Sequence, residues 1–250
     1  IDANVPVIKV ADFTKSPEIL DGRVKTLHPK IHGGILAKRS NDKHQKEIEV
    51  NKLELIDLVV VNLYPFKKKV EEQCSWEEAI ENIDIGGPSM IRSAAKNHAD
   101  VAVLVDPNQY KDYIAEIKKG PLKKEFKAKL AFEAFQHTAS YDNAISNWMS
   151  KEKELTASNF TESFPLIKQL RYGENPHQKA LWYGLNNIGW NSAEQLQGKE
   201  LSYNNLLDLE SAVSTIMEFG YDIKPNSDTE SVAAVILKHN NPCGASISNS

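Results

Sequence analysis

Short apolar runs alternate with segments of helical periodicity over the first 150 residues of the chain. Residues 56–63 and 101–105 are apolar and rich in β-branched side chains, which is typical of buried strands. Apolar residues recur at helical spacing over 122–149, and this stripe predicts long helices that cover a sheet. The alternation of strand and helix predicts an α/β domain with a parallel sheet.

The segment between the two predicted strands contains signals for two helices. Ser75 followed by Glu78 forms a capping box, which predicts a short helix that ends near residue 81. Residues 83–87 resemble a turn, and Pro88 suits the first position of a further helix over 89–97.

The second part of the chain is separated from the first by a polar stretch over 151–163 that lacks periodicity. We predict a strand over 180–183, a helix over 204–219 capped by Gly220, and a strong buried strand over 231–239. The predicted domains therefore cover residues 1–160 and 161–250.

The composition and charge of the chain argue against some classes of protein. The net charge of −4 over 250 residues argues against a general nucleic-acid binder. Cys74 and Cys243 are far apart without metal-type spacing, which suits a reducing cytosol. No apolar run reaches the length of a membrane span.

Potential cations are concentrated between Asp21 and Gly34. Such a cluster repels itself unless an anion or an acidic partner offsets the repulsion. Gly33 and Gly34 would let backbone amides approach an oxyanion closely. The segment is either a solvated basic loop or a phosphate-binding site. The cations are Arg23, Lys25, His28, Lys30 and His32.

A second candidate anion site lies where the turn at 86–88 enters the next helix, because a helix N-terminus presents free amides. Arg92 and Lys96 share one face of that helix, and Asp84 begins the turn. Each feature alone is compatible with an ordinary solvated surface. Together with Asn62 at the end of a predicted strand, where α/β sheets place ligands, they favour a binding site.

Several motifs resemble one known family. Asp-Gly-Arg-Val-Lys-Thr-Leu-His-Pro, Asn-Leu-Tyr-Pro-Phe and Ile-Asp-Ile-Gly-Gly-Pro followed by Ala-Ala-Lys-Asn-His resemble the bifunctional purine biosynthesis proteins. Arg-Tyr-Gly-Glu-Asn-Pro-His-Gln and Lys-His-Asn-Asn-Pro-Cys-Gly resemble the start of their second half. That family joins IMP cyclohydrolase to AICAR (5-aminoimidazole-4-carboxamide ribonucleotide) transformylase.

The resemblance implies a methylglyoxal-synthase-like domain over 1–160, followed over 161–250 by the beginning of a cytidine-deaminase-like α/β transformylase domain. It implies the last two steps of IMP synthesis, with 10-formyltetrahydrofolate as formyl donor. Family members begin earlier and continue much further, so we expect the chain to be an internal fragment that could be inactive alone.

The resemblance also implies roles for individual residues. Lys96 would donate and accept the proton in ring closure, His239 would be the base in formyl transfer, and Lys238 would stabilise its transition state. Substrate would be bound by Arg23, Val24, Lys25, Thr26, Val61, Asn62, Tyr64, Asp84, Ile85, Arg171 and Tyr172.

The expected partners are AICAR, formyl-AICAR, IMP and folate, together with a second copy of the chain in a homodimer. No metal, nucleic acid or membrane is expected. One alternative stays open, a non-catalytic module that senses phosphate or a nucleotide. A pure sensor, however, has no use for the Lys238–His239 and Arg171–Tyr172 pairs.

Overall fold

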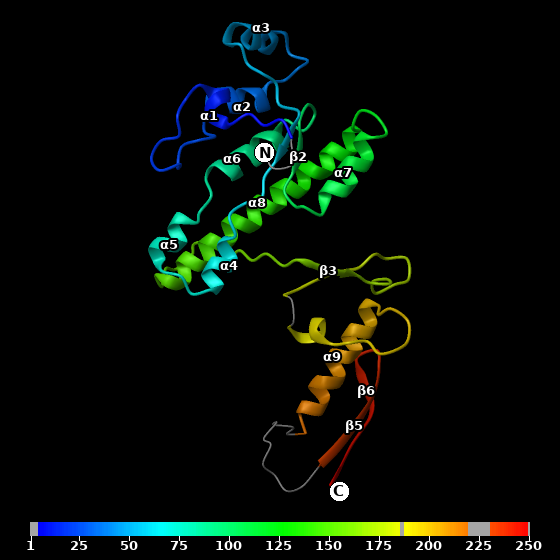
Figure 1. Cartoon of the computed structure of the whole chain (residues 1–250). Coiled ribbons are helices and arrows are strands. Elements are labelled where there is room, and N and C mark those ends of the chain that lie inside the picture. Colours follow the sequence, from blue (N-terminus) through cyan, green and yellow to red (C-terminus); the bar gives the residue numbers. More distant parts are fainter. Residues whose placement is uncertain (1–4, 186–187, 220–230, 250) are drawn as a thin grey trace. The chain divides into compact units, whose positions relative to one another are not determined.

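The computed structural model describes residues 5–185, 188–219 and 231–249 (Figure 1). The chain forms two compact units, Ile1–Glu162 and Ser163–Ser250, which divide close to the boundary predicted at residue 160. The first unit contains a parallel strand pair and most of the helices described. The described residues of the second form two antiparallel strand pairs and one α-helix.

The first unit places helices around two short parallel strands. Its elements are α1 (Val10–Thr14), α2 (Pro29–Leu36), α3 (Asp42–Asn51), β1 (Leu58–Val60), α4 (Phe66–Glu71), α5 (Trp76–Glu81), α6 (Gly86–Lys96), β2 (Ala102–Leu104), α7 (Gln109–Ile117) and α8 (Lys124–Glu152). β1 and β2 pair in parallel, with Val59 opposite Val103. The predicted α/β fold with parallel strands is confirmed, although the strands are shorter than their apolar runs.

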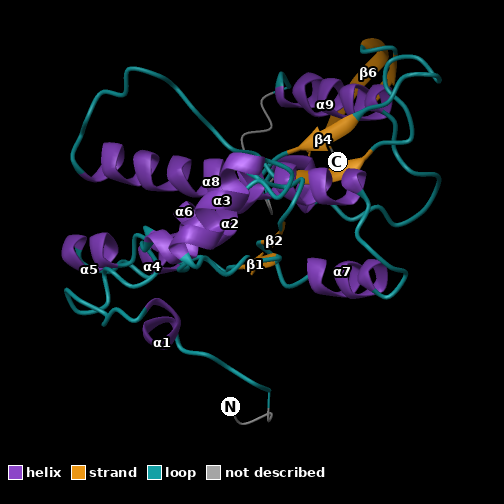
Figure 2. Ribbon diagram, turned by 90° about the horizontal axis from the view of Figure 1, so that it is seen from above, coloured by secondary structure: helices purple, strands orange, loops and turns teal. Residues whose placement is uncertain are grey.

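The core of the first unit lies between the strand pair and two long helices. α6 packs against α8, and both helices contact β2, as Figures 1 and 2 show. Ile91 and Ala94 of α6, Val103 of β2 and Ala134 of α8 are fully buried there. The apolar stripe predicted over 122–149 therefore belongs to one continuous helix whose buried face covers the strands.

The capping signal at Ser75 is confirmed, because its side chain accepts a hydrogen bond from the backbone N–H of Glu78 at the start of α5. The next helix, α6, begins at Gly86 rather than at Ser89, so Pro88 is its third residue. Proline is tolerated in the first turn because the N–H groups there have no partner within the helix.

The interpretation of Gly33 and Gly34 as an anion-binding loop is wrong, since both residues lie inside α2. A Cβ on Gly34 would collide with the backbone carbonyl of Glu54, and one on Gly33 would lie 2.9 Å from the Leu53 side chain. These glycines allow the helix to pack closely against residues 53–56.

The second unit consists of β3 (Leu166–Gln169), β4 (Leu181–Tyr183), a 3₁₀ turn (Gly189–Ser192), α9 (Tyr203–Met217), β5 (Ser231–Lys238) and β6 (Asn241–Asn249). β3 pairs with β4, and β5 pairs with β6, both antiparallel. α9 agrees with the helix predicted over 204–219, whereas its predicted cap, Gly220, lies outside the described residues.

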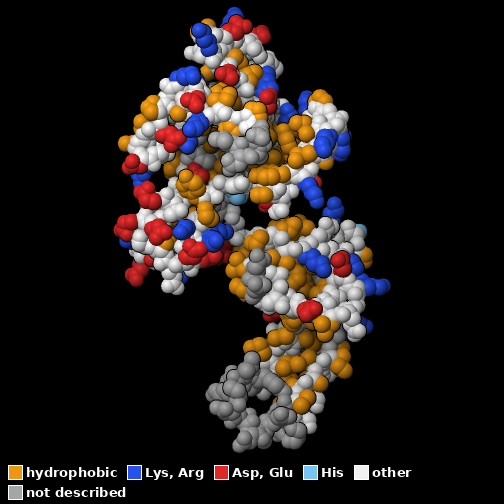
Figure 3. Space-filling view, in the orientation of Figure 1, with side chains coloured by type: hydrophobic (Ala, Val, Ile, Leu, Met, Phe, Trp, Pro, Cys, Tyr) orange, Lys and Arg blue, Asp and Glu red, His pale blue; other side chains and the backbone are white. Residues whose placement is uncertain are grey.

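The prediction that 231–239 is a buried strand is wrong in two respects. β5 ends at Lys238, and Val232 and Ile236 on one of its faces are 62% and 70% exposed. Apolar side chains accordingly gather over this hairpin in Figure 3. Among the described elements, β6 and α9 make the main contacts with β5, and the face that carries Val232 and Ile236 is exposed.

Candidate functional site

A small hairpin presents the cationic residues of the 21–34 segment. Ile19 and Val24 pair across it, and Leu20, Asp21 and Gly22 all have positive φ in the turn. Two of the predicted substrate-binding residues, Arg23 and Lys25, follow this turn with their side chains exposed.

Acidic side chains of the chain itself offset the repulsion within this cluster. Arg23 forms an ion pair with Glu81 of α5, and Lys25 pairs with Glu18 at 2.6 Å. All four side chains are at least 45% exposed, so each pair contributes little to stability. In Figure 3 basic and acidic side chains are interspersed over the face of the first unit that is shown.

The N-terminal end of α6 brings together residues from three segments of the sequence. Asp84 accepts a hydrogen bond from the backbone N–H of Gly87 at 2.8 Å. A Cβ on Gly86 would lie 2.6 Å from Oγ1 of Thr26, and one on Gly87 would lie 2.8 Å from the Leu63 side chain. Thr26 and Asp84 therefore meet at a helix N-terminus that could accept an anion.

Tyr141 of α8 also reaches this end of α6. Its hydroxyl accepts a hydrogen bond from the backbone N–H of Asp84 at 2.9 Å and donates one to the carbonyl of Asn82 at 3.3 Å. Burial is the main cause that raises the pKa of the Tyr141 hydroxyl, and the negative charges of Asp84 and Asp142 raise it further. The hydrogen bond from the N–H of Asp84 acts in the opposite direction and lowers this pKa.

The residues that follow β1 lie at the carboxyl end of the strand pair. The backbone N–H of Val61 still bonds to the carbonyl of Leu104, whereas Asn62 and Tyr64 have exposed side chains. The Asn62 amide donates to the hydroxyl of Tyr110 at 3.3 Å. Since Leu63 packs against the start of α6, this loop borders the same end of the helix.

Ile85, another predicted contact, occupies the position just before α6, with its side chain 59% exposed. Asp84, Ile85 and Thr26 are therefore brought together at one place, and Val61, Asn62 and Tyr64 belong to the adjacent loop. Arg23 and Val24 belong to the hairpin that is tied to α5 through Glu81.

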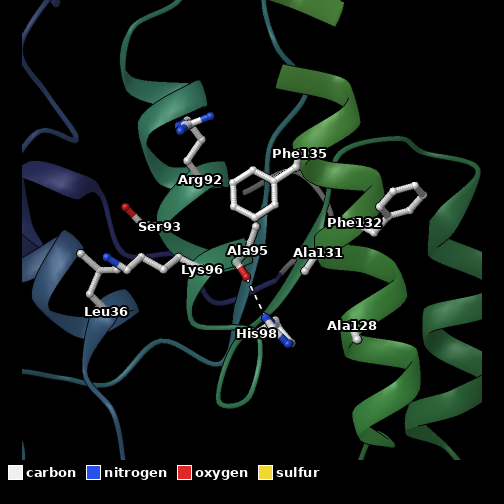
Figure 4. A pocket seen from close by; sticks show the side chains of 10 residues that line it. All are labelled: Leu36, Arg92, Ser93, Ala95, Lys96, His98, Ala128, Ala131, Phe132 and Phe135. Atoms are coloured by element: carbon white, nitrogen blue, oxygen red, sulfur yellow. Dashed lines mark hydrogen bonds between the residues drawn. The ribbon is translucent and has the colours of Figure 1, made fainter. Parts of the chain in front are cut away.

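Lys96 lies at the opposite end of α6. It comes ten positions after Gly86, which corresponds to about 15 Å along the helix axis. It lines a cavity of about 690 Å³ between α6 and α8. Figure 4 shows its side chain extending toward Leu36, whereas the Arg92 side chain points elsewhere and its guanidinium lies 5.6 Å from the centre of the Phe135 ring. The carboxylate of Asp84 therefore does not pair with Lys96.

Sequence reasoning missed the structural role of Asn97, which follows Lys96. Its side-chain amide donates to the carbonyls of Ile35 at 2.8 Å and Ala37 at 3.0 Å, and the residue is only 5% exposed. It thus binds carbonyl groups at the end of α2, where the last carbonyls of a helix generally have no partner within the helix. Only the folded pairing of α2 with α6 shows this role.

His32 is a second residue whose environment the sequence did not show. Its Nδ1 lies 3.2 Å from Oγ of Ser93. Because the Ser93 hydroxyl donates to the carbonyl of Ser89, it accepts from Nδ1–H of His32. Burial lowers the pKa of His32, and its Nε2 has no partner among the described residues.

In the second unit, the predicted pair Arg171 and Tyr172 is in direct contact. Nη2 of Arg171 donates to the Tyr172 hydroxyl at 3.2 Å, and the guanidinium carbon lies 4.8 Å from the ring centre. Arg171 also lines a cavity of about 520 Å³, together with residues of α9 and β5 that include Asp208 and Leu237.

Lys238 and His239 lie at the tip of the β5–β6 hairpin next to that cavity. Lys238 pairs with Asn241, and the two residues between them, His239 and Asn240, have φ of 54° and 63°. Two positive φ angles define a tight two-residue hairpin turn. The backbone N–H of Asn240 donates to Asp208 at 2.9 Å, which ties the tip to α9.

No group of three or more His, Cys, Asp or Glu in the described part of the chain could hold a metal ion. Within the same residues, no helix is both long and apolar enough to cross a membrane.

The two units and their strand pairs define an α/β protein with candidate ligand sites in each unit, and comparison with known proteins identifies its family. A family model described as MGS-like domain matches residues 1–89, and one described as AICARFT/IMPCHase bienzyme matches residues 94–250. The chain belongs to the AICARFT/IMPCHase bienzyme family. The match to the second model begins inside the first structural unit.

Curated relatives agree with this assignment. A bifunctional purine biosynthesis protein PurH of Prochlorococcus marinus strain MIT 9515 is 87% identical over 249 residues, and that of strain MIT 9301 is 75% identical over 250 residues. Each match covers 100% of this chain and 48% of the relative. The chain therefore spans about half the length of the curated relatives it matches.

One solved structure, described as the crystal structure of ForH, is 33% identical with a TM-score of 0.50. The match covers 58% of this chain and 77% of that one.

Proposed function

We propose that the chain is part of an enzyme that catalyses the last two steps of IMP synthesis. A transformylase activity would move a formyl group from 10-formyltetrahydrofolate to AICAR, and a cyclohydrolase activity would close formyl-AICAR to IMP. Family membership and the PurH names of the curated relatives support this proposal. The activities belong to the longer protein, and this chain would supply a large part of the cyclohydrolase site.

One observation supports the cyclohydrolase site most strongly: Thr26 and Asp84 meet at the N-terminus of α6. They are far apart in sequence, and both belong to motifs that resemble the family. In our proposal this end of α6 binds the nucleotide together with Arg23, Val24 and Lys25. Val61, Asn62, Tyr64 and Ile85 would supply the neighbouring contacts.

Ring closure is intramolecular, because the carboxamide nitrogen attacks the formyl carbon of the same molecule and water leaves. The protein therefore mainly has to hold the reactive rotamer and move protons. We assign the proton transfer to Lys96. Lys96 lies about 15 Å along α6 from Gly86. A nucleotide bound at the N-terminus of α6 therefore has to extend along the helix so that its reacting ring lies toward Lys96.

Formyl transfer requires a base for the weakly nucleophilic amine of AICAR and a cation for the developing oxyanion. We assign the first role to His239 and the second to Lys238. Arg171 and Tyr172 would bind the nucleotide. Arg171 and the hairpin that carries Lys238 and His239 border the same cavity, which supports this grouping.

The longer protein is proposed to act as a cytosolic homodimer without a metal ion. Its small-molecule partners would be AICAR, formyl-AICAR, IMP and folate.

Titration calorimetry of this chain with IMP tests the first site. We expect IMP to bind, inosine to bind much more weakly because it lacks the phosphate, and inorganic phosphate to bind weakly because it lacks the nucleoside. Phosphate that binds as tightly as IMP would instead favour the non-catalytic phosphate-sensing module. Absence of IMP binding would contradict the proposed nucleotide site on this chain.

A further inference from the structure

The hydroxyl of Tyr141 uses both of its hydrogen-bonding functions on the segment that leads into α6. It accepts from the N–H of Asp84 and donates to the carbonyl of Asn82. Both partners are backbone groups, so the hydroxyl fixes the path of the chain rather than the orientation of one side chain. Residues 82–84 are thereby attached to α8, a helix distant in sequence.

The same segment is also bonded to the helices on either side. The N–H groups of Asn82 and Ile83 bond to carbonyls of α5, and the carbonyl of Ile85 accepts from Ser89 of α6. Ile85, the residue just before the helix, has an apolar side chain that cannot cap the helix end. The side chain of Asp84 binds the N–H of Gly87 instead. Because Tyr141 accepts from the backbone N–H of the same aspartate, it contributes a long-range restraint to the position of this carboxylate.

The ring of Tyr141 is held independently of its hydroxyl. It packs edge-on against Phe66, whose side chain is 2% exposed, with 6.3 Å between ring centres. Phe66 also contacts Trp148, one further residue of α8. Phenylalanine at position 141 would keep these ring contacts and remove only the hydroxyl.

We propose that Tyr141 is a positioning residue for the ligand site at the N-terminus of α6. Its hydroxyl holds Asp84 and the entry of the helix in the geometry that receives the nucleotide. This inference rests on the proposed function, because the nucleotide is the ligand of that site.

The test compares Tyr141→Phe with Tyr113→Phe in the same chain. Tyr113 is a half-buried tyrosine of α7 that packs against the core and is not part of the ligand site, and burial raises its hydroxyl pKa as well. Amide hydrogen exchange by NMR reports on the backbone bond of Asp84, and titration calorimetry reports the affinity for IMP.

In Tyr141→Phe we expect the Asp84 amide to exchange about tenfold faster and the dissociation constant for IMP to rise about fivefold, as loss of one or two hydrogen bonds predicts. Tyr113→Phe is expected to change neither quantity. A merely structural role would lower the melting temperature without changing the affinity of the folded chain.

Unchanged exchange at Asp84 would show that the hydroxyl does not hold the segment, and unchanged IMP affinity with faster exchange would show that the restraint does not serve the ligand. Either result overturns the inference while the proposed function stands. If the native chain binds no IMP, the proposed nucleotide site fails and the ligand role of Tyr141 fails with it.

Discussion

Replacing Asn97 with alanine removes two hydrogen bonds from the contact between α2 and α6. The Asn97 amide donates to the carbonyls of Ile35 and Ala37, and all three residues are buried. Alanine leaves both carbonyls without this donor in a place where water has little access. The loss therefore includes the cost of burying unpaired polar groups as well as the bonds themselves.

The magnitude follows from the two bonds. A net contribution of about 1 kcal/mol for each bond, raised toward about 2 kcal/mol where the carbonyl stays buried and unpaired, gives a loss of about 2–4 kcal/mol. Domains of this kind are stable by only about 5–15 kcal/mol. The substitution should therefore remove a large part of the stability of the first unit.

Asn51→Ala is the matched control for this experiment. The Asn51 amide also donates to a backbone carbonyl, that of Glu47 at 2.8 Å, but the residue is exposed at the end of α3. Water can replace that bond, so we expect a change within about 0.5 kcal/mol. Urea unfolding followed by circular dichroism measures both variants. Equal losses in the two variants would refute the role assigned to Asn97.

Three further predictions follow from the packing, charges and protonation described above. Gly34→Ala should lower the free energy of unfolding by about 1–3 kcal/mol, because the new Cβ meets a backbone carbonyl. In Gly33→Ala the new Cβ meets only a flexible side chain, and alanine gains helix propensity. Equal effects of the two variants in urea unfolding would contradict this reasoning. Glu81→Gln removes the charge that pairs with Arg23, so calorimetry at low salt should show severalfold tighter binding of IMP. Unchanged affinity would show that Arg23 does not bind the nucleotide. Because burial lowers the folded-state pKa of His32, the unfolded chain takes up its proton first as the pH falls below 6.5, and stability falls with it. The free energy of unfolding of the His32→Gln variant should therefore fall less between pH 7 and pH 5 than that of the native chain. Urea unfolding that gives both chains the same pH dependence would exclude this contribution.

Local signals in the sequence predicted local structure well. Ser75 caps α5 as its spacing from Glu78 indicated, and the apolar run around Val103 forms a buried strand. The cap depends on neighbours within a few residues, and the strand depends on burial that its apolar residue types favour. The capping and strand signals therefore did not depend on knowing which elements pack together.

The 21–34 segment shows which structural features could not be predicted from the sequence. Glycines and cations together resemble a loop, yet Gly34 lies inside a helix, where its missing Cβ leaves room for residues 53–56. The charge of Arg23 is offset by Glu81, a partner 58 residues away. Only the long-range fold brings these groups together.

The position of Lys96 is different, because the sequence contained enough to place it. A helix that begins near Gly86 and includes Lys96 has to separate the two by nearly three turns. We grouped Lys96 with Asp84 because both belong to the predicted anion site around residues 84–96, whereas helix geometry alone already placed them at opposite ends of one element.

The length of α8 has a consequence for how its sequence can vary. Lys127 near its start binds the carbonyl of Ala99, Tyr141 binds the segment before α6, and Trp148 stacks on Trp76 at 4.6 Å between ring centres. These contacts depend on one helical phase, because each inserted residue would rotate everything beyond it by about 100°. Many exposed side chains of α8 can change, but insertion or deletion of a single residue between Lys127 and Tyr141 would turn the tyrosine away from Asp84.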